Sequence, residues 1–257
     1  MLRFAANLSM LFTDAPFLDR IDRAARAGFT LVEFQFPYSE PAAVIRSRMD
    51  AAGVAAVLHN LPAGNWEAGE RGIACHPDRV DEFRTGVDRA IAYANVLGVK
   101  KLNALAGIPP AGVTPGDARA ALVGNLRFAA RALAAVGLDL LVEPINTRDV
   151  PGFFIQGTDQ AIALLDDVGE PNAYVQYDAY HMQRMEGELA GTLQRHLSRI
   201  GHIQIADNPG RHEPGTGEIR FDFLFAHLER LGWQGPIGAE YKPVSYTHLR
   251  AHETKAN

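Results

Sequence analysis

Short apolar runs alternate with longer amphipathic stretches along the chain. This alternation is typical of repeated βα units built on a parallel sheet. The apolar runs predict eight strands, near residues 3–8, 30–35, 54–59, 99–103, 139–143, 174–178, 202–205 and 237–240. The amphipathic stretches between them predict helices near residues 17–27, 41–52, 80–97, 117–136, 158–168, 188–200 and 221–231.

Glycines mark the ends of several predicted helices. Gly28, Gly53, Gly98 and Gly137 each stand shortly before a predicted strand, which fits a left-handed cap at the carboxyl end of a helix. The eight βα units show no break in composition, and no G-x-G-x-x-G motif follows the first strand. Both observations favour one closed (β/α)8 TIM barrel over an open, doubly wound sheet.

Composition places the chain among ordinary soluble globular proteins. It has 257 residues, of which 47% are hydrophobic and 21% charged, so it can bury the core of one large α/β domain. The net charge of -5 provides no general basic field for nucleic acid. Cys75 is the single cysteine, so no internal disulfide forms and a cytoplasmic location is expected. Neither a signal-peptide pattern nor an apolar segment of membrane-spanning length occurs, so no membrane association is expected.

Two predicted connections are long and rich in turn residues. Residues 60–72 follow the third strand and suggest a lid, and residues 207–218 follow the seventh. Both are βα loops, which build the active site at the carboxyl end of a barrel.

The last stretch, residues 244–257, differs in kind from the rest. It has little apolar face to pack as an eighth outer helix, and it resembles a conceptual translation of sequencing-adapter read-through. We therefore expect a barrel over residues 1–243 and a non-native tail after it. His248 and His252 have the i, i+4 spacing of metal ligands on a helix, but a solvated tail is the simpler interpretation.

Four oxygen-bearing side chains stand at or near the ends of four successive predicted strands: Glu143, Asp178, Gln204 and Glu240. In a closed parallel barrel these strand ends share one rim. Three carboxylates that converge there repel one another unless a cation holds them. Any one of them alone is better explained as a helix cap or a partner of a surface lysine. Together they predict a site for a hard divalent cation, Mg²⁺ or Mn²⁺, which prefers oxygen ligands.

Other side chains near the same rim are candidates for substrate contacts. His181 follows Asp178 by three residues, in an expected loop, and is suited to polarise a substrate oxygen, although a structural role is an equal alternative. His59 ends the third predicted strand and is a weaker candidate of the same kind. The cations best placed to hold a substrate carboxylate are Arg71, Lys101 and Arg211.

Several motifs together resemble the hydroxypyruvate isomerase family and its close relative, the 2-oxo-tetronate isomerases. The resemblance runs from residue 1 to about residue 243. It rests on ANLSML at 6–11, HNLPAG at 59–64, AGERG at 68–72, VEPIN at 142–146, YHMQRMEG at 180–187, IAD at 205–207, EPGTGEI at 213–219 and EYKP at 240–243.

The resemblance implies a xylose-isomerase-like TIM barrel in which Glu143, Asp178, Gln204 and Glu240 bind the metal. It also implies that Glu143 and Glu240 serve as proton donor and acceptor. The expected reaction is an aldose–ketose isomerisation of a small keto acid through an enediolate, most simply hydroxypyruvate to 2-hydroxy-3-oxopropanoate. A homo-oligomer is possible on this scaffold, and the family's terminal helix is missing from the tail.

Three other functions are open at this stage. A 2-oxo-tetronate isomerase, or a ketose 3-epimerase on the same fold, would use the same paired carboxylates. A metal-dependent apurinic endonuclease would need a multi-zinc site richer in histidine and a basic surface, which the sequence does not predict. A catalytically silent sugar-binding protein would not need both Glu143 and Glu240.

Overall fold

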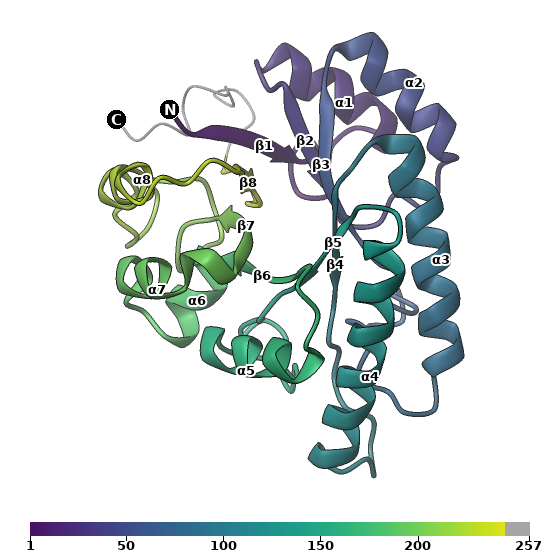
Figure 1. Ribbon diagram of the computed structural model, residues 1–257. Coiled ribbons are helices and arrows are strands. Elements are labelled where there is room, and N and C mark those ends of the chain that lie inside the picture. Colours follow the sequence, from purple (N-terminus) through teal and green to yellow (C-terminus); the bar gives the residue numbers. More distant parts are fainter. Residues whose placement is uncertain (245–257) are drawn as a thin grey trace.

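The computed structural model describes residues 1–244 of the chain. Eight parallel strands form a closed barrel in which each strand pairs with its neighbours in sequence and β8 returns to β1 (Figure 1). This confirms the predicted (β/α)8 barrel. The strands are β1 (Arg3–Asn7), β2 (Leu31–Phe34), β3 (Ala55–Asn60), β4 (Lys101–Ala104), β5 (Asp139–Val142), β6 (Ala173–Asp178), β7 (Ile200–Ile205) and β8 (Pro236–Ala239).

Helices connect the strands and form the outer layer, as the long helices α2, α3 and α4 show in Figure 1. Each packs an apolar stripe against the sheet, which is why the sequence shows helical periodicity between the strands. The helices are α1 (Phe17–Arg26), α2 (Ala42–Ala52), α3 (Val80–Leu97), α4 (Pro115–Ala134), α5 (Thr158–Val168), α6 (Ala179–Met185), α7 (Leu189–His196), η1 (Leu197–Arg199) and α8 (Phe221–Arg230).

The seven predicted helices are all present, and two of the predicted glycine caps show why they end where they do. Gly53 follows α2 with φ 69° and Gly98 follows α3 with φ 76°, the left-handed conformation that glycine adopts without steric cost. One prediction was wrong: residues 179–185, expected as a loop, form helix α6. Asp178 caps this helix by accepting a hydrogen bond from the Tyr180 amide at 2.8 Å.

The strand register decides which side chains meet inside the barrel. Asp178 of β6 is aligned with Gln204 of β7, and Asn7 of β1 with Glu33 of β2. Since all strands run in the same direction, their carboxyl ends lie at one rim of the barrel. The four predicted metal ligands therefore lie in or just after four neighbouring strands, β5, β6, β7 and β8.

The expectations for the last residues fall almost wholly outside the described part of the chain. Only Val244 of the predicted tail is described, and it is exposed. The expected loss of an eighth helix and the pair His248 and His252 concern residues 245–257, which lie outside the described residues. Within residues 1–244, none of the helices has both the length and the apolar character needed to cross a bilayer.

Candidate active site

Three carboxylates from three strands are buried at the carboxyl end of the barrel. Glu143 follows β5 directly, Asp178 is the last residue of β6, and Glu240 follows β8. Their side chains are all 6% exposed or less. The fourth predicted ligand, Gln204, is also buried and lies in β7. The structure therefore places all four residues in or just after strands β5 to β8, and their role as metal ligands stays a prediction.

Burial makes this cluster electrostatically costly. Desolvation, together with repulsion from Glu240 and Asp178, raises the pKa of Glu143 well above its usual range. Burial likewise raises the pKa of Glu240 and raises that of Asp178 to about 7. Arg211 opposes these shifts because its Nη2 lies 2.6 Å from Glu240 Oε2 and 3.4 Å from Asp178 Oδ2. One guanidinium does not balance three carboxylates.

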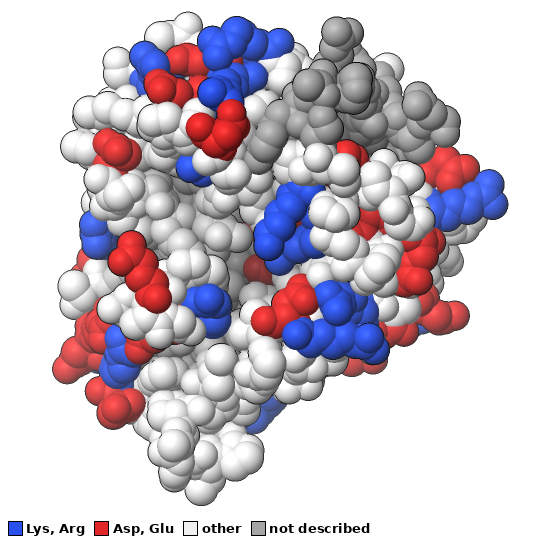
Figure 2. Space-filling view, turned by 180° about the vertical axis from the view of Figure 1, so that it is seen from behind, with Lys and Arg blue, Asp and Glu red and all other residues white. Residues whose placement is uncertain are grey.

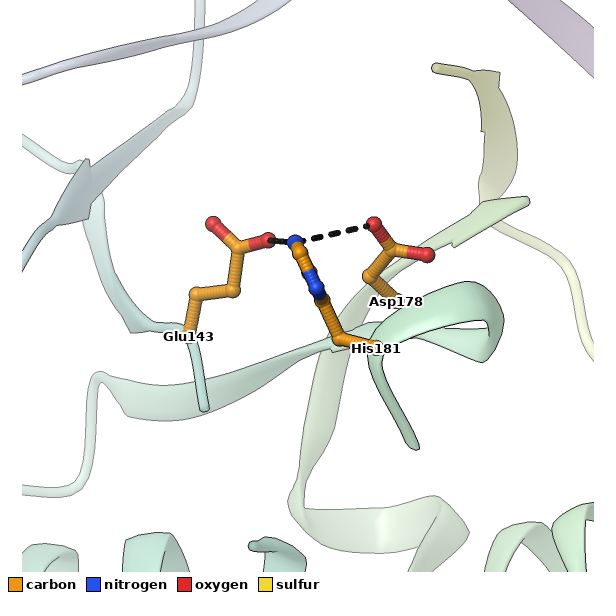
Figure 3. Close-up of side chains that lie close together, drawn as sticks. All are labelled: Glu143, Asp178 and His181. Atoms are coloured by element: carbon orange, nitrogen blue, oxygen red, sulfur yellow. Dashed lines mark ion pairs between the residues drawn. The ribbon is translucent and has the colours of Figure 1, made fainter. Parts of the chain in front are cut away.

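The donor set fits a hard divalent cation. Glu143, Asp178 and His181 offer ligand atoms that all lie within 4.8 Å of one another, and Figure 3 shows the imidazole between the two carboxylates. His181 Nε2 is 3.8 Å from Glu143 Oε1 and 3.6 Å from Asp178 Oδ2. Buried carboxylates with raised pKa values and too little counter-charge are an environment in which a divalent cation can replace protons.

Gln204 belongs to a buried polar layer beneath these carboxylates. Its Nε2 donates to Glu33 Oε1 at 2.6 Å, and its Oε1 accepts from Gln176 Nε2 at 2.7 Å. Gln176 also donates to Glu143 Oε2 at 3.0 Å. Glu33 Oε2 also lies within hydrogen-bonding distance of His202 Nε2, at 2.8 Å. The amide of Gln204 is therefore fixed in orientation by its neighbours on β2 and β6.

Sequence reasoning missed this layer. Glu33, Gln176, Asn7 and Asn103 are fully or almost fully buried inside the barrel. Asn7 Nδ2 donates to Glu240 Oε1 at 2.9 Å, and Asn103 Nδ2 donates to Glu143 Oε2 at 3.0 Å. The signal was available, because a polar residue within an apolar run, such as Glu33 in Leu31–Phe34, has no solvent to face in a closed barrel.

Arg211 reaches the carboxylates from the loop between β7 and α8, which Asp207 organises. The buried carboxylate of Asp207 accepts hydrogen bonds from four backbone amides, those of Asn208, Gly215, Gly217 and Ile219. Arg211 also places its guanidinium 5.1 Å from the centre of the Tyr180 ring. The predicted turn-rich segment thus delivers one of the predicted cations to the site.

The predicted lid segment, residues 60–72, brings a second predicted cation, Arg71, to the site. Arg71 and Trp66 line a cavity of about 160 Å³ together with Glu143, His181, Arg211 and Glu240. Arg71 lies over the Trp66 ring, 4.2 Å from its centre, and its Nη1 donates to the backbone carbonyls of Trp66 and Glu70. These contacts hold the guanidinium at the wall of the cavity.

Two predicted substrate contacts are not at this cavity. Lys101 is the first residue of β4, and its Nζ donates to the backbone carbonyl of Gly201 at the amino end of β7. It lies at the opposite end of the barrel from the carboxylates. His59 is fully buried, with its ring stacked on Phe34 and its Nδ1 3.3 Å from the Tyr38 hydroxyl. Its position in the core explains why burial lowers its pKa to about 4.

Comparison with known proteins agrees with this geometry and with the family predicted from the motifs. A model of the xylose isomerase-like TIM barrel family matches residues 21–256. The hydroxypyruvate isomerase of Escherichia coli (strain K12) is 53% identical over 247 residues, which cover 96% of each chain. The 2-oxo-tetronate isomerase of Cupriavidus necator is 48% identical, with 96% of this chain and 95% of that one covered.

A solved structure extends the likeness to three dimensions. The crystal structure described as AP endonuclease, family 2, from Brucella melitensis has a TM-score of 0.94 and 44% sequence identity, with 96% of each chain covered. The chain belongs to the xylose isomerase-like TIM barrel family and, within it, is an isomerase of the hydroxypyruvate isomerase group.

Proposed function

We propose that this isomerase interconverts hydroxypyruvate and 2-hydroxy-3-oxopropanoate by proton transfer. The observation that carries the proposal is the pair Glu143 and Glu240, two buried carboxyl groups that line one small cavity from strands β5 and β8. The reaction removes a proton from C3 of the substrate and returns one to C2, while a hydroxyl proton moves from O3 to O2. An enediolate connects the two states.

The raised pKa values of Glu143 and Glu240 suit this chemistry. Burial shifts the pKa of each carboxyl group upward, which makes each a stronger base towards a carbon-bound proton than an exposed glutamate. One member of the pair takes the carbon-bound proton, and the other holds a proton close to the substrate oxygens. The closed barrel interior around them keeps bulk water away from the enediolate, whereas the two carboxyl groups exchange their protons with solvent between turnovers.

A divalent cation completes this site. Glu143, Asp178, Gln204 and Glu240 would hold Mg²⁺ or Mn²⁺, and the cation would polarise the substrate carbonyl and offset the negative charge of the enediolate. Gln204 is neutral, so the protein side contributes three negative charges at most. With a divalent cation bound, the net negative charge of the site is therefore small enough to admit an anionic substrate.

Arg71 is the group we assign to the substrate carboxylate. The guanidinium of Arg211 is engaged by Glu240 and Asp178. That of Arg71 bonds backbone carbonyls through Nη1 alone and retains further N–H donors for a carboxylate. The cavity of about 160 Å³ holds roughly the volume of five liquid waters. That size suits a three- or four-carbon acid better than a six-carbon ketose.

A second candidate substrate is a four-carbon 2-oxo-tetronate, because a relative with that name is 48% identical. An endonuclease activity, as named for the Brucella melitensis protein, is less well supported for this chain. Its chemistry favours a basic surface, whereas Figure 2 shows Lys and Arg interspersed with Asp and Glu over the face drawn. A cytoplasmic location suits an enzyme of small-molecule metabolism with one buried, unpaired cysteine.

The test is a substrate comparison on the purified protein supplied with Mg²⁺ or Mn²⁺. We expect kcat/KM for hydroxypyruvate to exceed that for 2-oxo-tetronates and for neutral ketoses such as fructose. Turnover in D₂O should place deuterium on the carbon that receives the proton, because the glutamates exchange with solvent. Turnover of neutral ketoses alone, or product free of deuterium, would contradict the proposal. Incision of an abasic DNA duplex would instead support an endonuclease function.

A further inference from the structure

Asn146 lies three residues after Glu143, fully buried, and the orientation of its side-chain amide can be assigned. One end of the amide accepts hydrogen bonds from the backbone N–H groups of Arg148 and Asp149, at 3.1 and 2.9 Å. A backbone N–H only donates, so the atom facing these two groups is the oxygen, Oδ1. The nitrogen, Nδ2, therefore points the other way.

Nδ2 of Asn146 faces the imidazole of His181. It lies 2.6 Å from His181 Nδ1 and 3.1 Å from Asp149 Oδ2. Asp149 is itself held by the Tyr180 hydroxyl at 2.7 Å and by Arg184 at 2.7 Å, so it accepts from Asn146. The backbone N–H of Asn146 points at the same His181 Nδ1, at 3.4 Å. Two N–H donors thus converge on this one ring nitrogen.

A ring nitrogen that accepts hydrogen bonds carries no proton. The imidazole of His181 is then neutral, and its single proton is on Nε2. This nitrogen faces the cavity, at 3.6 and 3.8 Å from the Asp178 and Glu143 oxygens, which is longer than a hydrogen bond. Its N–H is therefore directed to where a substrate oxygen would bind.

We infer that Asn146 is a positioning residue that holds His181 as the Nε2–H tautomer, and that His181 acts as a hydrogen-bond donor to the substrate and not as a metal ligand. A nitrogen that bears a proton has no lone pair for a cation. A fixed neutral donor stabilises charge that develops on a substrate oxygen without giving up its proton. The assignment of the substrate contact rests on the proposed function, whereas the tautomer does not.

The tautomer is measured directly by long-range ¹H–¹⁵N NMR of protein labelled at histidine nitrogen and supplied with diamagnetic Mg²⁺. His181 is identified as the signal that is lost in His181→Gln. We expect a pyridine-type shift for Nδ1 and a pyrrole-type shift for Nε2. A pyrrole-type Nδ1 in the unsubstituted protein would overturn the inference, whatever the substrate proves to be.

Asn146→Asp tests whether Asn146 is the cause. A carboxylate at this position accepts from the ring, so Nδ1 should gain a proton and kcat should fall about 100-fold. Asn172→Asp is the matched control. The Asn172 amide is likewise a hydrogen-bond donor, but its acceptors are the backbone carbonyls of Ala130 and Leu138, and the residue precedes β6 at the amino end of the barrel. It should leave the His181 spectrum unchanged.

Asn146→Ala keeps the test decisive if the aspartate variant fails to fold. Only the long backbone contact to Nδ1 then remains, so both tautomers should appear in the spectrum. If both variants fold and keep the pure Nε2–H signature, Asn146 does not set the tautomer and the inference is wrong. If they shift the tautomer but kcat stays within about twofold, His181 is not the donor that the substrate needs.

Discussion

The two ends of the barrel both hold partly or fully buried charges, but they balance them differently. At the amino end, Lys101 of β4 lies beside Asp139 of β5, one charge of each sign, and the ammonium is bonded to the carbonyl of Gly201. At the carboxyl end, Glu143, Asp178 and Glu240 lie together, and Arg211 is the arginine within ion-pair distance of two of them, Asp178 and Glu240. A balanced pair serves the fold, whereas an unbalanced cluster is costly to bury and indicates a site that binds a cation or moves protons.

Removing a charge from the proton-transfer pair should have the largest effect. Glu143→Gln and Glu240→Gln should each lower kcat by about 10²–10⁴-fold, because glutamine cannot exchange a proton. Circular dichroism should show an intact fold, since glutamine keeps the shape of the side chain and removes a charge that is costly to bury. Glu170→Gln is the control, because Glu170 pairs with Arg131 on the outside of the barrel. Near-normal turnover in either site variant would remove that residue from the mechanism.

Metal affinity should separate Asp178 from its neighbour His181. Asp178→Asn removes a charged oxygen ligand and should weaken Mg²⁺ or Mn²⁺ binding, measured by calorimetry, by at least about tenfold. His181→Gln should change the affinity much less, since the imidazole presents a proton to the cavity. Equal losses in both variants would show that His181 is a ligand and that the cluster of Glu143, Asp178 and His181 is the metal site itself.

The pH dependence of stability should reveal the same imbalance without any substrate. Burial raises the pKa of Asp178 to about 7 from its ordinary value of 3.8. The unfolded chain therefore loses this proton first as pH rises, and the metal-free protein is destabilised between about pH 4 and about pH 7. Its thermal midpoint should fall over this window more steeply than that of Asp178→Asn.

Metal should reverse that trend. Because the cation binds deprotonated carboxylates, the increase in thermal midpoint on adding Mg²⁺ or Mn²⁺ should be larger at about pH 8 than at about pH 5. If the thermal midpoint of the metal-free protein does not change between about pH 4 and about pH 8, in either the unsubstituted protein or Asp178→Asn, the carboxylates are better solvated than their burial indicates.

The strand ends were predictable from sequence because apolar runs locate strands, and parallel strands in a barrel share their rims. That reasoning placed Glu143, Asp178 and Glu240 correctly without any contact being known. The polar layer was not predicted, since a lone Glu33 in a strand has no partner in the sequence; its partners His202 and Gln204 lie on β7, and only barrel closure brings them together. Helix α6 was missed because its seven residues are too few to show a helical period.

Arg71 should affect substrate binding more than chemistry. Arg71→Met removes the guanidinium that we assign to the substrate carboxylate, so KM for the keto acid should rise about 10–100-fold, the value of one or two charge-assisted hydrogen bonds. kcat should fall much less, because Glu143 and Glu240 are untouched. Since Met keeps an apolar stem over Trp66, the loop should hold its position. An unchanged KM would mean that Arg211, and not Arg71, binds the substrate carboxylate.

Lys101 should give the smallest effect and so complete the comparison of the two ends. Lys101→Met keeps most of the apolar stem of the side chain and removes the hydrogen bond to Gly201, which stabilises the fold by about 1 kcal/mol. The thermal midpoint should fall by a few degrees, and kcat/KM should stay within about twofold, because the ammonium is at the amino end. A large loss of activity with an unchanged thermal midpoint would mean that the amino end communicates with the active site, and the division between a structural end and a catalytic end would no longer hold.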